Sequence, residues 1–219
     1  RFITVIAQHQ PMAQTSDQAR PTLAERTVVD CDVHVAHEAP DVKREIGSRM
    51  DEPYRTHLNT SGPNYAPYPR DSIPKDPVGE REGADNLDAS TFAATPEELQ
   101  SGIYGSMDID VTILNSLQKL DLIPEERSVR EMRAVNDSLL ERFLEDNDQY
   151  YGLALLGTQR PDATAEEIDR LGAEDDFVGG LIINGPSDKP LGHQRYDPIY
   201  RAAEDNGWTV VFHSATIGY

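Results

Sequence analysis

Apolar residues recur with two different periods along the second half of the chain. Over residues 125–146 they lie three or four positions apart and form one stripe, which predicts the longest helix. Short continuous apolar runs predict strands at 111–114, 151–156, 177–183 and 208–212. Because these strands are apolar on both faces and alternate with helices, the pattern indicates a parallel sheet covered by helices.

Helix boundary signals agree with this alternation. Thr95-Pro96-Glu97-Glu98 combines an N-cap residue, a first-turn proline and a capping-box glutamate, and predicts a helix that ends near Gly105. Further helices are predicted over 161–172, over 196–206 and, interrupted by Pro53, within 41–58.

Residues 28–35, Val-Val-Asp-Cys-Asp-Val-His-Val, alternate with the two-residue period of a strand. Asp30, Asp32 and His34 fall on one face, and the opposite face is apolar. A half-exposed surface strand would alternate too, but it accounts less well for a polar face made only of two carboxylates and an imidazole. Cys31, the single cysteine, is interpreted as a small buried hydrophobe on the apolar face.

A doubly wound sheet and a barrel both fit five such strands. The polar face of the first strand suits a barrel interior, where polar groups gather near the C-terminal rim. No Gly-rich phosphate loop follows this strand, since Ala36-His37-Glu38-Ala39-Pro40 comes directly after it, and nucleotide binding loses its main support. We predict an α/β fold, a (β/α)8 TIM barrel of the metal-dependent hydrolase type, with about its first five strands in this chain.

The remaining segments differ in composition. Residues 1–27 are polar without a lasting period and predict a loose N-terminal extension. Residues 36–94 are rich in Pro, Gly, Asp and Arg and predict a long insertion, either a lid beside the site or disordered chain. Residues 28–219 are then the N-terminal part of a single barrel domain.

The chain of 219 residues carries 39 acidic and 20 basic residues, a formal net charge of -19. This excess argues against nucleic acid and anionic membranes as partners. Only four of the basic residues are lysines, and an acidic, lysine-poor surface suits concentrated salt, so we predict a halophilic source. No apolar run approaches the roughly 18 residues that span a bilayer, and no secretory signal pattern occurs, which predicts a cytoplasmic protein.

Polar side chains stand where the predicted strands end. Asp32 and His34 end the first strand, Asn115 the second, Asn184 the fourth and His213 the fifth. Because the C-terminal ends of parallel barrel strands share one mouth, these side chains are expected to lie close together. One carboxylate and two imidazoles form a ligand set for Zn, Mn or Fe that leaves positions open for water and substrate.

The chain resembles the amidohydrolase-related family, which includes aminocarboxymuconate semialdehyde decarboxylase and related aromatic acid decarboxylases. The resemblance runs from about Val28 to the end of the chain. It rests on several motifs in a consistent order: Val29-Asp30-Cys31-Asp32-Val33-His34, Ala134-Val135-Asn136-Asp137, Tyr151-Gly152-Leu153-Ala154, Val178-Gly179-Gly180-Leu181, Tyr196-Asp197-Pro198-Ile199-Tyr200-Arg201-Ala202-Ala203-Glu204 and Val210-Val211-Phe212-His213.

This resemblance implies a ligand set. Asp32 occupies the first position of a pattern that is usually His-x-His, His34 occupies the second, and His213 matches the metal-binding histidine of the fifth strand. Asn184 stands where a lysine would mark the binuclear branch, so the resemblance implies one divalent ion, Zn or Mn. It also implies that the catalytic histidine and a metal-binding aspartate lie beyond Tyr219, and hence that the chain is the N-terminal part of a longer protein.

The resemblance leaves the reaction open. A metal-activated water would hydrolyse a small carboxylated or cyclic organic substrate. Alternatively, the ion and an arginine would hold an aromatic or unsaturated carboxylic acid for non-oxidative decarboxylation. Asn115 and Asn184 are candidate substrate-binding residues, and the candidate arginines of the insertion are Arg44, Arg49, Arg55 and Arg70. An inactive barrel fragment or binding domain is the alternative from another class, and homo-oligomerisation is left open.

Overall fold

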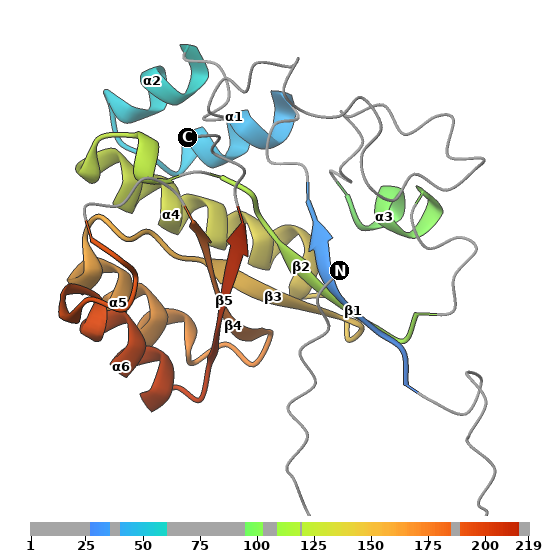
Figure 1. Ribbon diagram of the computed structural model, residues 1–219. Coiled ribbons are helices and arrows are strands. Elements are labelled where there is room, and N and C mark those ends of the chain that lie inside the picture. Colours follow the sequence, from blue (N-terminus) through green and yellow to red (C-terminus); the bar gives the residue numbers. More distant parts are fainter. Residues whose placement is uncertain are drawn as a thin grey trace, which may run out of the picture.

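The structure is a computed structural model that describes residues 27–35, 40–60, 95–102, 109–118, 120–184 and 189–214 (Figure 1). The predicted N-terminal extension lies outside these residues except for residue 27. So does the predicted insertion apart from 40–60, and the lid therefore stays a prediction. No helix in the described part of the chain is long and apolar enough to cross a membrane.

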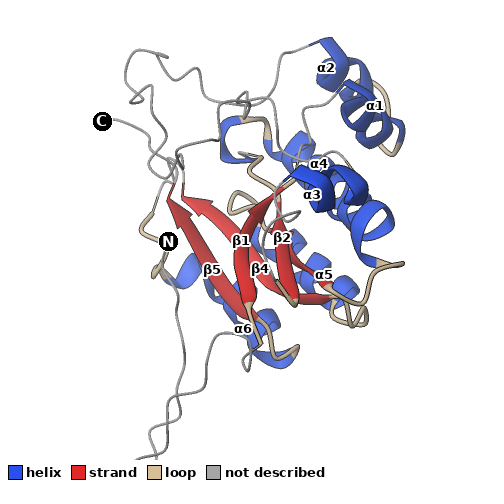
Figure 2. Ribbon diagram, turned by 90° about the vertical axis from the view of Figure 1, so that its right-hand side faces the viewer, coloured by secondary structure: helices blue, strands red, loops and turns tan. Residues whose placement is uncertain are grey.

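Five parallel strands form one sheet in the order β1-β2-β3-β4-β5. The strands are β1 Val29–His34, β2 Val111–Asn115, β3 Tyr150–Leu155, β4 Phe177–Asn184 and β5 Thr209–Ser214. The sheet curls into a half-barrel, as the view turned by 90° shows (Figure 2). This confirms the predicted fold class, a part of a TIM barrel with its first five strands.

Three helices cover the outer side of the sheet, and two lie beyond the C-terminal ends of the strands (Figures 1 and 2). The covering helices are α4 Glu125–Leu139, α5 Pro161–Leu171 and α6 Asp197–Asp205. The two at the strand ends are α1 Pro40–Ser48 and α2 Tyr54–Thr60, separated by Pro53 as predicted. A further helix, α3, spans Pro96–Gly102, and the 3-10 turns are Leu120–Leu122 and Gln194–Tyr196.

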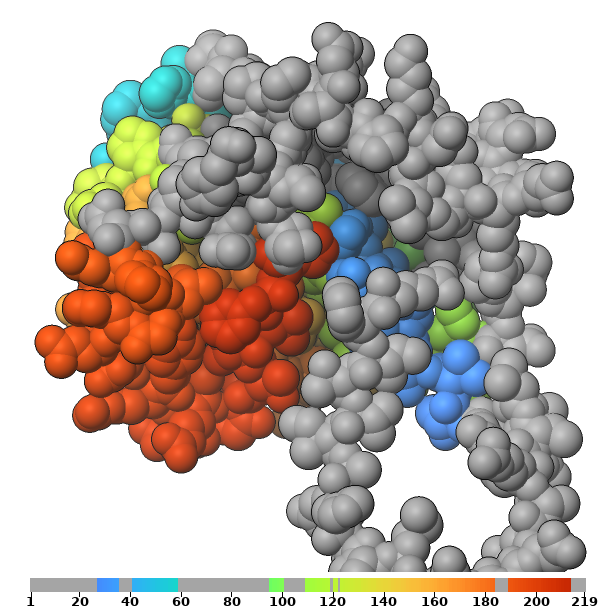
Figure 3. Space-filling view, in the orientation of Figure 1, coloured from blue at the N-terminus to red at the C-terminus, as the bar shows by residue number. Residues whose placement is uncertain are grey.

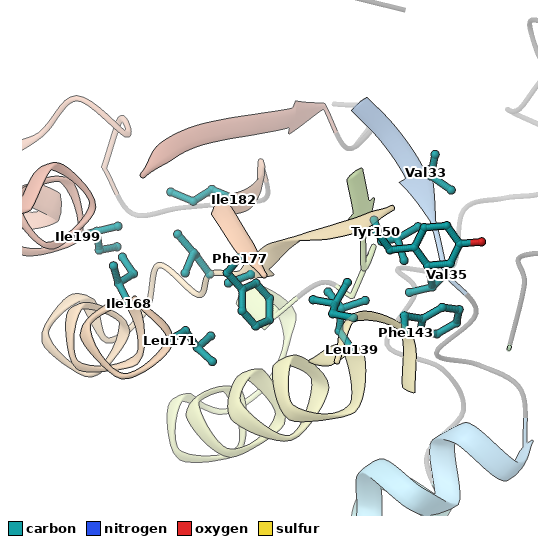
Figure 4. Packing of buried hydrophobic residues seen from close by; sticks show 14 of the residues in the cluster. Val33, Val35, Leu139, Phe143, Tyr150, Ile168, Leu171, Phe177, Ile182 and Ile199 are labelled. Atoms are coloured by element: carbon teal, nitrogen blue, oxygen red, sulfur yellow. The ribbon is translucent and has the colours of Figure 1, made fainter. Parts of the chain in front are cut away.

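A cluster of buried apolar side chains fills the space between the sheet and these covering helices (Figure 4). Phe177 and Ile182 of β4 pack there with Leu139 of α4, Leu171 of α5 and Ile199 of α6. Each of these side chains is less than 5% exposed. The predicted apolar stripes of the helices therefore face the predicted apolar strands.

Asn136 ties α4 to the middle of the sheet. Its amide accepts a hydrogen bond from the Leu155 N–H at 2.7 Å and donates to the Leu155 carbonyl at 3.2 Å. The same amide nitrogen donates to Glu167 of α5 at 2.9 Å. These partners are structural, so the Asn136-containing motif holds helices to the sheet.

The helix predicted over 125–146 changes its winding before it ends. The α-helix stops at Leu139 and continues as a π-helical turn over Leu140–Leu144, where the Glu145 N–H donates to the Leu140 carbonyl at 3.1 Å. Phe143 and Leu144 of this turn are both buried. Simple 3.6-residue periodicity does not reveal such a turn.

The prediction that one face of β1 is apolar and buried is only partly right. Val33 and Val35 are buried, but Val29 is 44% exposed and Cys31 is also exposed. The cause is that β1 is an edge strand with a β-bulge. Asp30 lies opposite Thr112 and Val33 lies opposite Leu114, so the two residues between them in β1 lie opposite a single residue of β2. Cys31 is therefore not a buried hydrophobe.

Candidate metal centre

The bulge of β1 ends at Asp32, and His34 follows on the same side of the strand. The Asp32 Oδ1 and His34 Nε2 atoms are 3.1 Å apart. Asp30 lies before the bulge, and its Oδ1 accepts the backbone N–H of Asp32 at 3.4 Å. Asp30 thus contacts the backbone of the bulge and is not one of the three grouped ligand residues.

His213 reaches the same place from β5, at the opposite edge of the sheet. In the β4–β5 register it pairs with Ile183, near the C-terminal end of the strands. Its Nε2 lies 3.9 Å from Asp32 Oδ1, and its ring meets that of His34 edge to face, with ring centroids 5.3 Å apart. The curl of the half-barrel therefore brings the tips of two non-neighbouring strands together.

The donor set formed by Asp32, His34 and His213 fits a divalent ion. One ligand atom from each residue lies within 4.8 Å of the others. Two atoms bound to one ion at about 2.1 Å can be at most about 4.2 Å apart. The two Asp32–histidine distances, 3.1 and 3.9 Å, meet this limit. The ligand atoms of the two histidines lie within 4.8 Å of each other, so the imidazoles need to approach by at most about 0.6 Å.

The charge state of Asp32 suits this role. The hydrogen bond with His34 lowers the pKa of the Asp32 carboxyl to about 2, and hydrogen bonding from Asn115 and the charge of His213 act in the same direction against the opposing effect of burial. The Asp32 side chain is 60% exposed, whereas those of His34 and His213 are 20% and 23% exposed. An ionised carboxylate therefore faces solvent between two shielded imidazoles.

The two asparagines predicted to bind substrate have different positions. Asn115 is fully buried at the end of β2, and its Nδ2 donates to Asp32 Oδ1 at 3.1 Å. Asn184 ends β4, and its backbone lies opposite Ser214 of β5. Substrate binding by either residue stays a prediction.

Two of the candidate arginines have other partners. Arg49 donates to Glu45 at 2.8 Å and to both Glu141 oxygens at 2.7 and 2.6 Å, which fixes α1 to the turn after α4. Arg55 donates to the carbonyls of Gly47 and Met50. Arg70 lies outside the described residues.

The sequence pattern does not single out Asp121, a carboxylate on the turn after β2. Thr158, which follows β3, donates its hydroxyl to Asp121 Oδ1 at 2.7 Å. Burial raises the pKa of the Asp121 carboxyl, against the effect of hydrogen bonding from Thr158. The pair links the rims of two neighbouring strands, and no local sequence signal marks a contact between residues 37 positions apart.

A pocket of about 290 Å³ lies at the start of α5, apart from the three ligand residues. Its lining is Glu125, Gln159, Arg160, Pro161, Asp162 and Arg195. Two arginines and two carboxylates give this lining no excess of either charge. The pocket therefore does not define a second charged site.

Comparison with known proteins finds a matching family model and a curated relative. A family model described as amidohydrolase matches residues 29–218. A curated relative, gamma-resorcylate decarboxylase from Rhodococcus jostii (strain RHA1), is 37% identical over 106 residues, which are 48% of this chain and 32% of the relative.

Several solved structures, including two 5-carboxyvanillate decarboxylases, have a similar fold. 5-Carboxyvanillate decarboxylase from Sphingomonas paucimobilis has a TM-score of 0.58 and 18% identity, over 85% of this chain and 51% of that one. The 5-carboxyvanillate decarboxylase from Novosphingobium aromaticivorans, complexed with manganese and 4-hydroxy-3-methoxy-5-nitrobenzoic acid, has a TM-score of 0.53 and 19% identity, over 92% and 54%. The chain thus spans about half the length of these proteins.

Proposed function

Since the chain belongs to the amidohydrolase family, we propose that it is part of a metal-dependent, non-oxidative decarboxylase of a hydroxylated aromatic carboxylic acid. The observation that carries this proposal is the convergence of Asp32, His34 and His213 from opposite edges of the sheet. The relatives support the reaction type, because the gamma-resorcylate and 5-carboxyvanillate enzymes are both decarboxylases.

The ligand set determines the charge of the proposed centre. Asp32 contributes one negative charge, and two neutral imidazoles contribute none, so a divalent ion would leave the centre with a net positive charge. When bound, the ion would supply the charge that orients a substrate carboxylate and a neighbouring hydroxyl oxygen. This arrangement favours an anionic, oxygen-rich small molecule as substrate.

The remaining contacts keep the Asp32 carboxylate in place. Asp30 accepts the Asp32 backbone N–H, and Asn115 and His34 hold Oδ1. The reaction exchanges the carboxylate for a proton at the ring carbon and releases CO2.

We propose Mn or Zn as the metal. A carboxylate in place of one imidazole shifts preference toward harder ions such as Mn²⁺, whereas imidazoles suit Zn²⁺ equally well. The manganese in the Novosphingobium aromaticivorans decarboxylase supports the first choice.

Release of CO2 from defined aromatic acids tests the proposed reaction. The Mn²⁺-loaded protein, produced together with any sequence downstream of Tyr219, is expected to release CO2 from 2,6-dihydroxybenzoate or 5-carboxyvanillate. It should leave 3,5-dihydroxybenzoate, which lacks a hydroxyl beside the carboxylate, unchanged. His34→Ala should abolish the release. Activity that survives complete metal removal would contradict the proposal.

Metal-dependent hydrolysis is the second candidate, because the matched family model is described as amidohydrolase and the same ligands could activate water. Hydrolysis of lactones or amides without CO2 release would favour it. A protein inactive toward both substrate groups would favour the alternative of a binding domain.

Two predictions from the sequence accompany this proposal: a halophilic source and a cytoplasmic location. A folding titration against KCl tests the first. We expect stability to rise strongly with KCl because the chain carries a net charge of -19. Full stability in dilute buffer would contradict a halophilic source.

A further inference from the structure

Asn115 is the buried polar residue nearest to the proposed ligands. In the β1–β2 register it lies opposite His34, and its side chain is fully buried. Its Nδ2 donates to Asp32 Oδ1 at 3.1 Å, across two neighbouring strands. Its amide oxygen Oδ1 is buried without a hydrogen-bond partner among the described residues.

The orientation of this amide follows from hydrogen-bond chemistry. An ionised carboxylate only accepts hydrogen bonds, so the NH2 group of Asn115 must face Asp32 and the oxygen must face the interior. A substrate in the mouth of the half-barrel would therefore meet Asp32 before it could meet Asn115 Oδ1. The position suits a residue that acts through Asp32.

We infer that Asn115 is a positioning residue that holds the Asp32 carboxylate for the metal; the inference rests on the metal centre proposed above. Asp32 needs such a partner because its side chain is 60% exposed and follows a bulge in an edge strand. Once His34 directs its Nε2 lone pair to an ion, that nitrogen no longer hydrogen-bonds to Asp32. The Asn115 amide still donates to Oδ1.

The buried Asn115 oxygen allows fold stability and metal affinity to change in opposite directions. A buried acceptor without a donor destabilises the fold, whereas an apolar group of similar size does not. Asn115→Leu should therefore keep or increase the stability of the metal-free protein while it weakens metal binding. A residue with a merely structural role would show the opposite, a loss of stability with unchanged metal affinity.

Mn²⁺ titration followed by electron paramagnetic resonance tests this, with thermal unfolding of the metal-free protein alongside. Asn115→Leu is expected to lower Mn²⁺ affinity about tenfold or more, the range for residues that orient a ligand. In the Asp32→Ala background the same substitution should change the residual affinity less than about twofold, because its effect passes through Asp32. Ser138→Ala, which removes a buried hydroxyl bonded to Glu45 at 2.8 Å, is the control and should leave Mn²⁺ affinity unchanged.

The outcomes separate this inference from the proposed function. Wild-type affinity in Asn115→Leu, or an equal loss in both backgrounds, would overturn the positioning role alone. Unchanged Mn²⁺ affinity with a raised KM for an aromatic acid would replace it with direct substrate binding. Failure of the wild-type protein to bind Mn²⁺ would overturn the metal centre and the inference together.

Discussion

The middle and the edges of the sheet are built differently. In β3 and β4, Ala154, Leu155 and Leu181 are at most 1% exposed. On the edge strands, Val29 of β1 and Phe212 of β5 are 44% and 52% exposed. In the space-filling view, residues of both edges, blue for β1 and red toward the end of β5, reach the surface (Figure 3).

The proposed chemistry lies on the edges and the packing lies in the middle. Asp32 and His34 belong to β1 and His213 to β5, whereas β2 to β4 and the covering helices supply most of the buried apolar side chains. The ligands thus depend on the curl of the sheet, which the middle strands set. Substitutions in the two regions should therefore separate stability from metal binding.

The largest loss of stability is expected for Leu155→Ala in β3. Leu155 is 1% exposed, and truncating such a side chain leaves a cavity that lowers the free energy of unfolding by about 3 kcal/mol. Urea denaturation of the metal-free protein measures this. A loss below about 1 kcal/mol would show that the middle of the sheet is not the packing centre.

Gly179→Ala should affect both regions, because Gly179 of β4 touches the neighbouring edge strand. A Cβ at this position would lie 2.4 Å from the backbone oxygen of Thr209 in β5, so the two strands would have to separate. We expect a loss of about 2 kcal/mol in stability and weaker Mn²⁺ binding, since β5 also carries His213. Unfolding and Mn²⁺ titration measure the two effects.

Gly192→Ala is the matched control, because a Cβ there meets nothing within 4 Å. It should change neither stability nor Mn²⁺ affinity. Undiminished Mn²⁺ affinity in Gly179→Ala would show that the position of β5 does not govern the site.

The stability of the folded protein and the titration of the Asp32 carboxyl should both depend on pH through the contacts of Asp32 on the edge strand. Its pKa is lowered from 3.8 to about 2 in the folded protein, so the ionised carboxylate stabilises the fold above about pH 4, and this contribution disappears as the pH falls to about 2. The effect on stability is small because the side chain is largely exposed. Carboxyl-carbon NMR of the metal-free protein should show a midpoint near pH 2, raised in His34→Ala; a wild-type midpoint near 3.8 would refute the His34 contact.

The smallest effect is expected for Val29→Ala on β1. Because Val29 is 44% exposed, its truncation should lower stability by about 0.5 kcal/mol or less. Urea denaturation beside Leu155→Ala gives the comparison directly. A loss as large as that of Leu155→Ala would mean that Val29 is covered in the folded protein.

Local sequence signals predict most of the fold. The apolar runs mark β2 to β5, and Pro161 and Pro53 mark a helix start and a helix break, because periodicity and proline geometry act over a few residues. The bulge of β1 and the exposure of Cys31 depend on a partner strand about 80 residues away and on edge position. No pattern within the strand contains that information.

The same distinction applies to the candidate site. The i, i+2 spacing places Asp32 and His34 together. Strand-end position and the family resemblance indicate His213 as a third ligand, but its approach to the other two depends on the curl of five strands. The contact between Asn115 and Asp32 likewise depends on the β1–β2 register. Strand-end position therefore identifies the candidates, and tertiary structure assigns their contacts.

Metal analysis after equilibrium dialysis against Mn²⁺ or Zn²⁺ tests the central claim most directly. The protein should retain about one ion per chain, and both Asp32→Ala and His213→Ala should lose it, whereas His193→Ala, a histidine outside the group, should not. Loss in both variants would show that two opposite edges of the sheet share one ion. A wild-type protein without a stoichiometric ion, or variants that retain it, would contradict the metal centre.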